Sequence, residues 1–263
     1  MTAGVRVQSA ATSTDFYPTP PLVTRALVDF WEGRYPLPLS VFDPCAGVGC
    51  LLAAWANRPY GSETIDLSGV EMRSDLVRHS GKVWRTFEQP SPIFHGDGLK
   101  CLENGRRSED DANGPRRWPN AYKEERRELI VINPPFKRAD DWVNAGADAA
   151  LAFGSSVAIL LRSQWIDDGN TKGRHSWRAI APHPYQTYHQ RSCDSILRIP
   201  WRVSFDGKRA NSCTYAWHVW VPYKRKISGV ETYWSRQRAY YERDPKCDRV
   251  WKRAAKLSSL EHG

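Results

Sequence analysis

A run of four apolar residues, Leu129–Ile132, ends at Asn133-Pro134-Pro135, and this boundary constrains the fold more than any other feature of the chain. Three of the four are β-branched, so they predict a short buried strand. Proline has no backbone N–H and cannot extend a strand ladder, and the residue before a proline is held in extended geometry. A polar side chain is therefore fixed at a strand tip. Together with the ring of Phe136, it forms a rigid arc that suits a flat group carrying an amino group.

Short apolar runs alternate with helix-type patterns over residues 39–161. The expected strands cover residues 39–42, 66–71, 93–95, 129–132 and 157–161. The expected helices cover residues 22–31, 50–56, 74–84 and 139–151. This alternation predicts an α/β fold with a doubly wound, mostly parallel sheet, right-handed crossovers and a ligand crevice at the carboxyl ends of the strands.

Two later runs, Ile196–Phe205 and Cys213–Val221, lie on either side of the turn sequence Asp206-Gly207. Every second residue of the second run is apolar from Tyr215 to Val221, which favours a strand. The turn between the runs predicts a hairpin. We expect this hairpin to close one edge of the sheet in antiparallel fashion.

Polar and glycine residues follow the first three expected strands. The first strand runs into Asp43–Gly49 (DPCAGVG) and then a helix, and glycine lets a backbone approach a ligand closely at such a turn. Glu71 ends the next strand roughly 20 residues later, where ribose-binding carboxylates occur in doubly wound folds. Asp97 follows the third strand. Taken singly, each has a plainer explanation, such as a surface carboxylate that starts a helix.

The net charge of +9 is distributed unevenly. Residues 1–161 carry −2 and residues 162–263 carry +11, and seven of the twelve tryptophans lie in the basic half. Cationic and stacking side chains together favour a nucleic-acid partner. A solvated basic tail with core tryptophans would explain the same composition.

The length of 263 residues fits one α/β domain with additions. We expect a disordered N-terminus over 1–14, a main domain over 15–222, and a basic extension of one or two helices over 223–263. Within the main domain, 100–128 reads as a charged insertion and 163–192 as an irregular basic loop.

The sequence favours a cytoplasmic protein. No apolar run reaches the roughly 18 residues of a membrane span, and the first residues lack a signal-peptide pattern. The six scattered cysteines predict reduced thiols, with neither disulfides nor a metal site. The oligomeric state is left open.

Several of these pieces together resemble the S-adenosylmethionine-dependent DNA adenine-N6 methyltransferases, whose fold is the class I, Rossmann-like methyltransferase fold. The matching segments keep the order of that family: Asp15–Pro20 (DFYPTP), Asp43–Gly49, Glu71, Asp97 and Asn133–Phe136 (NPPF). Three segments downstream are similar to the phage-associated branch of small Dam-like enzymes: Leu160–Arg162, Arg202–Phe205 and Tyr215–Trp220. The resemblance covers about residues 15–221 and implies a bacterial or phage-infected cell.

The resemblance implies a role for each matching residue. The catalytic residues would be Asn133, Pro134, Pro135 and Phe136, whose oxygens accept the N–H groups of a flipped adenine while the ring stacks on it. S-adenosylmethionine would be held by Tyr17, Thr19, Asp43, Cys45, Ala46, Gly47, Gly49, Glu71, Met72 and Asp97. The sulfonium of this cofactor is the electrophile, so the chemistry needs no metal and no nucleophilic side chain.

The chain departs from the family by having no long target-recognition domain. Nucleic-acid contacts, mostly to phosphate, are therefore expected from basic and aromatic residues near the site. These are Lys137, Arg138, Arg162, Lys172, Arg174, Trp177 and Arg178. Three other functions remain open: an RNA adenine methyltransferase, a protein-glutamine methyltransferase, and a catalytically inactive nucleic-acid-binding module on the same fold.

Overall fold

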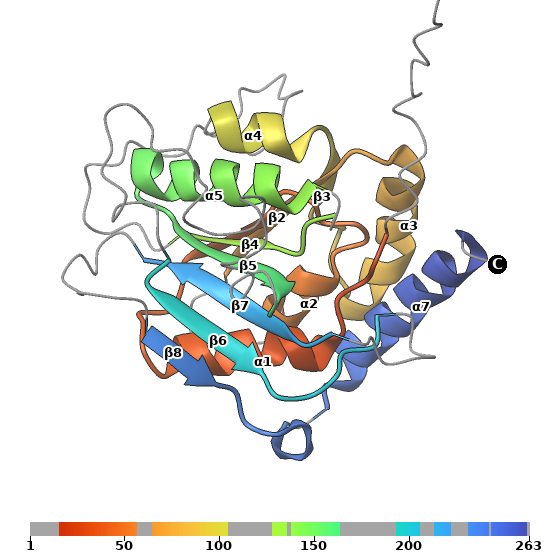
Figure 1. The fold of residues 1–263 in the computed structure, drawn as a ribbon. Helices are drawn as coiled ribbons and strands as arrows, with labels where there is room; N and C mark the ends of the chain where they lie inside the picture. The colour runs from red at the N-terminus through yellow and green to blue at the C-terminus, as the bar shows by residue number, and fades with distance from the viewer. Residues whose placement is uncertain are drawn as a thin grey trace, which may run out of the picture.

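The computed structural model describes residues 16–56, 65–104, 128–135, 138–163, 193–205, 213–221, 231–241 and 243–261. These residues form one eight-stranded sheet with helices on both faces (Figure 1). The strands are β1 Ser40–Asp43, β2 Asp66–Glu71, β3 Ile93–His95, β4 Glu128–Ile132, β5 Ser156–Arg162, β6 Ser195–Ile199, β7 Tyr215–Trp220 and β8 Glu231–Trp234.

The order of strands across the sheet is β3-β2-β1-β4-β5-β7-β6-β8. Strands β1 to β5 are parallel to one another. The carboxyl ends of β1, β2, β3 and β4 therefore all lie along the same side of the sheet, at the ends of the strands. The chain reverses direction across the sheet after β3, which makes the point between β1 and β4 the topological switch point. Ligands bind at such a point in open α/β sheets.

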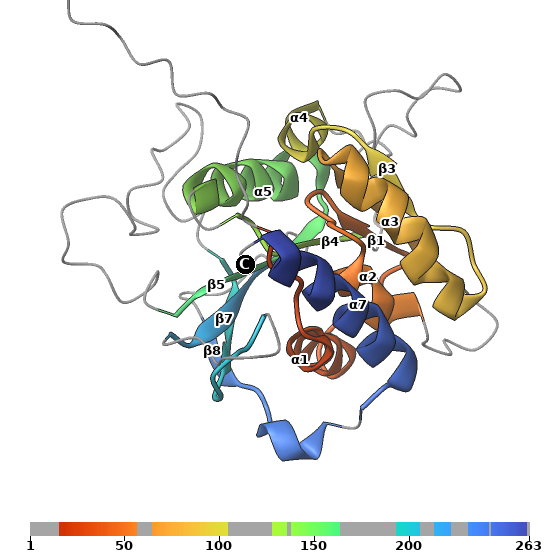
Figure 2. The ribbon, with the colours of Figure 1, turned by 90° about the vertical axis from the view of Figure 1, so that its right-hand side faces the viewer.

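Helices α1 Pro21–Glu32, α2 Cys50–Ala56, α3 Ser74–Trp84 and α7 Pro245–Glu261 cover one face of the sheet (Figures 1 and 2). Helices α4 Gly98–Asn104 and α5 Ala139–Phe153 cover the other. Two short 3-10 helices, η1 Arg85–Phe87 and η6 Arg238–Tyr240, complete the described elements.

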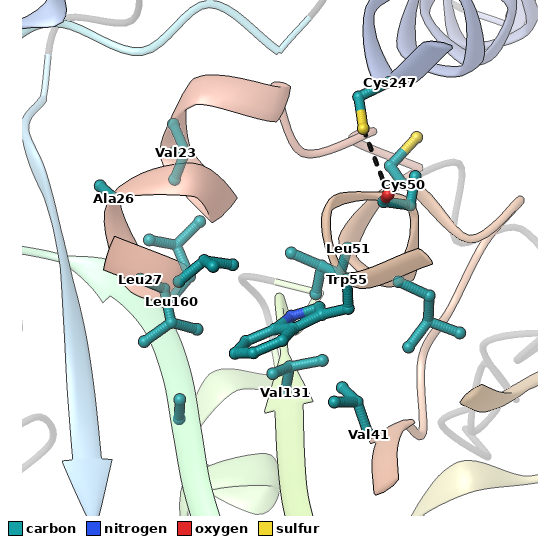
Figure 3. Close-up of a cluster of buried hydrophobic side chains, with 14 of the residues drawn as sticks. Val23, Ala26, Leu27, Val41, Cys50, Leu51, Trp55, Val131, Leu160 and Cys247 are labelled. Atoms are coloured by element: carbon teal, nitrogen blue, oxygen red, sulfur yellow. Dashed lines mark hydrogen bonds between the residues drawn. The ribbon is translucent and has the colours of Figure 1, made fainter. Parts of the chain in front are cut away.

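Alternate side chains of the central strands pack into the two hydrophobic layers on opposite faces of the sheet. Val131 and Leu160 pack with Leu27 and Trp55 under α1 and α2 (Figure 3). Their neighbours in the strands, including Ile132, point to the opposite layer under α5. Because both faces are buried, these strands read as continuous apolar runs, which is why the sequence predicts them well.

The predicted hairpin is confirmed as a pair, but its place in the sheet differs from the prediction. Strand β7 pairs antiparallel with both β5 and β6, so it lies inside the sheet and is not an edge. Strand β6 then runs in the same direction as β5. The edge is β8, which pairs parallel with β6, and Figure 1 shows the two arrows side by side.

One of the helices expected after residue 222 is present as α7, and the same segment also contains a strand that was not expected. Residues 231–234 form strand β8, and Tyr233 packs against Phe30 of α1 with ring centroids 5.3 Å apart. The guanidinium of Arg34 lies 4.2 Å from the centroid of the Tyr233 ring. Helix α7 buries Cys247 and Val250 in the core beneath it. Both elements therefore belong to the main fold.

The predicted insertion over 100–128 is wrong at both ends. Residues 100–104 continue helix α4, where Cys101 and Leu102 are buried against the layer of α5. Glu128 is the first residue of β4 and is buried. Most residues between these two ends are charged or turn-forming, so the few apolar residues at either end were assigned to the insertion. Residues 105–127 lie outside the described part of the chain.

Candidate active site

The turn between β1 and α2 has two residues in the left-handed region, Gly47 at φ +56° and Gly49 at φ +87°. A Cβ on Gly47 would lie 2.4 Å from Phe16, and a Cβ on Gly49 would lie 2.5 Å from the indole nitrogen of Trp84. That nitrogen also donates to the carbonyl of Val48 at 2.9 Å. The turn therefore requires glycine at both positions, for conformation and for space.

Glu71, at the tip of β2, ties this turn to the neighbouring strand. Its Oε2 accepts the backbone N–H of Gly47 at 2.9 Å, and its Oε1 accepts the backbone N–H of Arg73 at 2.8 Å. Burial raises the pKa of the Glu71 carboxyl, and these two hydrogen bonds oppose the rise. Each carboxylate oxygen has further lone pairs, so Glu71 can still accept hydroxyl donors.

Asp43 ends β1 and is buried. Its Oδ1 accepts the backbone N–H of Cys45 at 3.0 Å. Burial raises the pKa of Asp43 to about 8, the hydrogen bond from Cys45 opposes this, and the nearby Glu71 adds to it. The thiol of Cys45 donates to the carbonyl of Asn133 at 3.4 Å, which joins the tip of β1 to the tip of β4.

The side-chain amide of Asn133 is held by residues 16–20, here called the strap. Its Nδ2 donates to the carbonyl of Tyr17 at 3.1 Å and to the hydroxyl of Thr19 at 2.9 Å. A backbone carbonyl can only accept, so the amide must present its NH₂ group to the strap. The Oδ1 atom is buried, and it accepts no hydrogen bond from the described residues. A buried acceptor without a donor is costly, so Oδ1 retains hydrogen-bonding capacity that no described residue uses.

Asp97 and Met72 lie near the same edge. Asp97 Oδ1 accepts the backbone N–H of Leu99 at 3.0 Å, so this carboxylate caps helix α4. A Cβ on Gly98 would lie 1.6 Å from the carbonyl oxygen of Pro44, which places the start of α4 directly against the tip of β1. The Met72 side chain is 58% exposed.

The structure thus brings together the predicted cofactor and catalytic residues that it describes. Ten cofactor-binding residues were predicted, and all lie in the strap or at the tips of β1, β2 and β3. Asn133, Pro134 and Pro135 follow the tip of β4 in the described chain, and Pro134 is buried. Phe136 lies outside the described residues.

The predicted nucleic-acid contacts are mostly outside the described residues: Lys137, Lys172, Arg174, Trp177 and Arg178. Arg162 is the exposed last residue of β5, opposite Tyr215 of β7. Arg138 is exposed and forms an ion pair with Asp141 at 2.9 Å, in the first turn of α5. Arg138 also lines a cavity of about 550 Å³ between α4 and α5.

Residues of α7 also contact the site, and the sequence gives no sign of them. The indole of Trp251 donates to the carbonyl of Pro18 at 3.1 Å, and the hydroxyl of Ser258 donates to the carbonyl of Phe16 at 2.8 Å. The sequence predicts the helix that ends at Trp84, but it does not predict the contact of the Trp84 indole with the glycine turn. Side-chain donors to distant carbonyls leave no spacing pattern in a sequence.

Within the described ranges, no group of three or more His, Cys, Asp or Glu side chains could hold a metal ion. The described helices are all too short or too polar to cross a membrane. All six cysteines are free thiols.

No protein-family model matches the chain, and no curated protein matches it in sequence. Solved structures do match. A candidate class I S-adenosylmethionine-dependent methyltransferase from Listeria monocytogenes has a TM-score of 0.55 and 12% identity, covering 96% of this chain and 73% of that chain. The fold is that of the class I methyltransferases.

Two further solved structures match with lower TM-scores. A type I restriction-modification system methyltransferase subunit from Streptococcus thermophilus has a TM-score of 0.49 and 15% identity, covering 94% of this chain and 53% of that chain. The present chain therefore spans about half the length of that subunit. A candidate RNA methyltransferase from Pyrococcus horikoshii has a TM-score of 0.47 and 14% identity, covering 80% of this chain and 89% of that chain.

Proposed function

We propose that the protein transfers a methyl group from S-adenosylmethionine to the N6 amino group of adenine in DNA, with the base rotated out of the duplex. The observation that carries this proposal is the state of the Asn133 amide. Both of its N–H groups are engaged by the strap, and its Oδ1 is buried with no donor among the described residues. Such an atom is a fixed acceptor for the N–H of a planar amino group.

The residues around the glycine turn fit the proposed cofactor. The ring of Phe16 and the indole of Trp84 pack against Gly47 and Gly49, so the left-handed turn is held in one conformation beside the proposed cofactor. The carboxylates of Glu71 and Asp97 are acceptors suited to ribose hydroxyls and to an adenine amino group, respectively. Asp43 and the strap residues Tyr17 and Thr19 would meet the amino acid end. When bound, S-adenosylmethionine supplies the methyl group, and its sulfonium takes the electron pair of the broken carbon–sulfur bond.

The role of Asn133 follows from the chemistry of the acceptor base. The lone pair of an adenine amino group is delocalised into the ring, so the nitrogen is a poor nucleophile. A hydrogen bond from this N–H to Asn133 Oδ1, with the Pro134 carbonyl as a second acceptor, favours the pyramidal nitrogen on which the lone pair is available. Transfer leaves the methylated nitrogen cationic, and its acidic proton then passes to solvent water, so no dedicated general base is required.

The choice of a nucleic acid rests on the charge distribution, and the choice of adenine rests on the NPPF sequence. Residues 162–263 carry a net charge of +11, which suits a polyanion. Flipping a base costs a few kcal/mol, and less for a base that is already unpaired, so single strands compete with duplexes as substrates. RNA is the runner-up substrate.

The test is methyl transfer from S-adenosylmethionine labelled in the methyl group, with product nucleosides identified by mass spectrometry. Unmethylated duplex DNA, single-stranded DNA and RNA are compared at equal concentration. We expect N6-methyladenine in DNA. Transfer to RNA alone would replace DNA by RNA in the proposal, and no transfer to any of the three would refute it.

Asn133→Ala is expected to lower kcat about 100-fold or more, because it removes an acceptor that acts on the reacting group. Binding of S-adenosylmethionine, followed by calorimetry, should persist. The matched control is Asn144→Ala in α5, whose Oδ1 is also buried without a donor among the described residues. An Asn133→Ala variant with the wild-type rate would contradict the assigned role.

A further inference from the structure

Three carbonyls of the strap accept hydrogen bonds from side chains of two distant elements. Ser258 of α7 donates to Phe16, Asn133 donates to Tyr17, and Trp251 of α7 donates to Pro18. The strap lies outside any helix or strand, and its two prolines have no N–H with which to form a ladder. Side-chain donors therefore take the place of regular backbone pairing.

The strap contacts both halves of the candidate active site. Its Tyr17 carbonyl and Thr19 hydroxyl are the two acceptors that orient the Asn133 amide. The ring of Phe16 lies against Gly47 in the glycine turn. A shift of the strap would therefore move the partners of the catalytic amide and a wall of the cofactor turn at once.

Helix α7 is anchored independently of the strap. The thiol of Cys247 donates to the carbonyl of Ala53 in α2 at 3.1 Å (Figure 3), and Arg253 donates to the carbonyl of Lys82 in α3 at 3.1 Å. Val250 and Ala254 are fully buried in the core. Figure 2 shows α7 lying over α2, beside α1 and α3. Because α7 is anchored to α2, α3 and the core, it is a rigid support for the strap, which its Trp251 and Ser258 side chains contact.

We propose that Trp251 and Ser258 of α7 are positioning residues for methyl transfer. They fix the strap, and the strap fixes the Asn133 amide with Oδ1 turned toward the substrate. This inference rests on the proposed function for its effect on rate, but the effect on the amide itself is independent of activity.

The experiment compares Ser258→Ala and Trp251→Phe with matched controls that lose the same group without losing a bond. Ser68→Ala is the control for the serine, and Trp55→Phe is the control for the tryptophan. Both control side chains are buried and have no hydrogen-bond partner among the described residues. The first readout is hydrogen exchange of the Asn133 side-chain NH₂ by NMR, assigned from its loss in Asn133→Asp.

A lost hydrogen bond of ordinary strength corresponds to about a 2- to 13-fold change in an equilibrium. We expect each α7 variant to speed exchange of the Asn133 NH₂ and to lower kcat by a factor within this range. The controls should leave both unchanged. Unchanged amide exchange in Ser258→Ala and Trp251→Phe would overturn the inference, even if both variants melted at a lower temperature.

A double-mutant cycle separates positioning from general stability. If α7 acts through the strap, Ser258→Ala should cost less in kcat when Thr19→Val has already removed one partner of Asn133. Additive effects on log kcat would contradict the inference. A wild-type protein without any methyl transfer would refute the proposed function, whereas the exchange measurement would still decide whether α7 holds the amide.

Discussion

Replacing Thr19 by valine removes one partner of the Asn133 amide at nearly constant volume. Thr19 is 3% exposed, and its hydroxyl accepts from Asn133 Nδ2 at 2.9 Å. The amide cannot escape by rotating half a turn, because Oδ1 would then face the Tyr17 carbonyl, and both atoms are acceptors. One N–H of this part-buried amide is therefore left without its protein partner.

An unsatisfied buried donor costs about 1–3 kcal/mol. At roughly 2–4 °C per kcal/mol for a chain of this size, the Tm should fall by about 2–12 °C. Urea unfolding followed by circular dichroism gives the free energy of unfolding directly, and kcat should fall as well because the amide is less fixed. Thr19→Ser keeps the hydroxyl, so its free energy of unfolding should stay close to that of the wild type.

Thr24→Val is the matched control. Thr24 lies in α1, is fully buried, and its hydroxyl has no hydrogen-bond partner among the described residues. Its replacement loses no bond and should leave stability unchanged or improve it. Equal losses in Thr19→Val and Thr24→Val would refute the reasoning, because the cost would then come from the valine and not from the amide.

Three further outcomes are expected. The Asp43 carboxyl has a pKa of 3.8 when unperturbed and about 8 in the folded protein, so folding takes up a proton between these values and stability falls as pH rises through this window. The Tm measured from pH 6.5 to pH 8 should therefore fall, and it should fall less in Asp43→Asn. Gly98→Ala, whose Cβ would meet the Pro44 carbonyl oxygen at 1.6 Å, should lose about 1–3 kcal/mol or more in urea unfolding. Gly81→Ala, which has open space in helix α3, should gain about 0.5–1 kcal/mol, and the reverse order would contradict the packing described for Gly98. Glu71→Gln should weaken S-adenosylmethionine binding about tenfold in calorimetry, because it weakens both the proposed acceptor of the ribose hydroxyls and the hydrogen bond to the glycine turn. An unchanged Kd would remove Glu71 from the proposed cofactor site.

The central parallel strands β1, β4 and β5 could be predicted from the sequence because they are buried on both faces. Runs such as Leu129–Ile132 and Val157–Leu161 are continuous and apolar, and each is followed by a polar or turn-forming residue. The same pattern placed Asp43, Glu71 and Asn133 at strand tips. Their meeting at one edge then follows from parallel pairing alone.

The remaining elements could not be predicted, for different reasons. Strand order across the sheet depends on long-range pairing, so nothing in Tyr215–Trp220 shows that it lies between β5 and β6. Strand β8 is four residues long with only half of its side chains facing the fold, too little for a pattern. The contacts of Trp251 and Ser258 with strap carbonyls depend on the backbone of their partners, which carries no residue identity.

The hydrogen bonds from α7 to the strap also bear on the order of folding. They join residues 233 and 242 positions apart in the chain. Closing a loop of that length costs roughly 2–3 kcal/mol more entropy than closing one of about 15 residues. Such contacts form late, after the sheet and its local helices. During refolding, we therefore expect a compact chain with a complete sheet to precede the competent site, so recovery of activity should lag behind recovery of secondary structure.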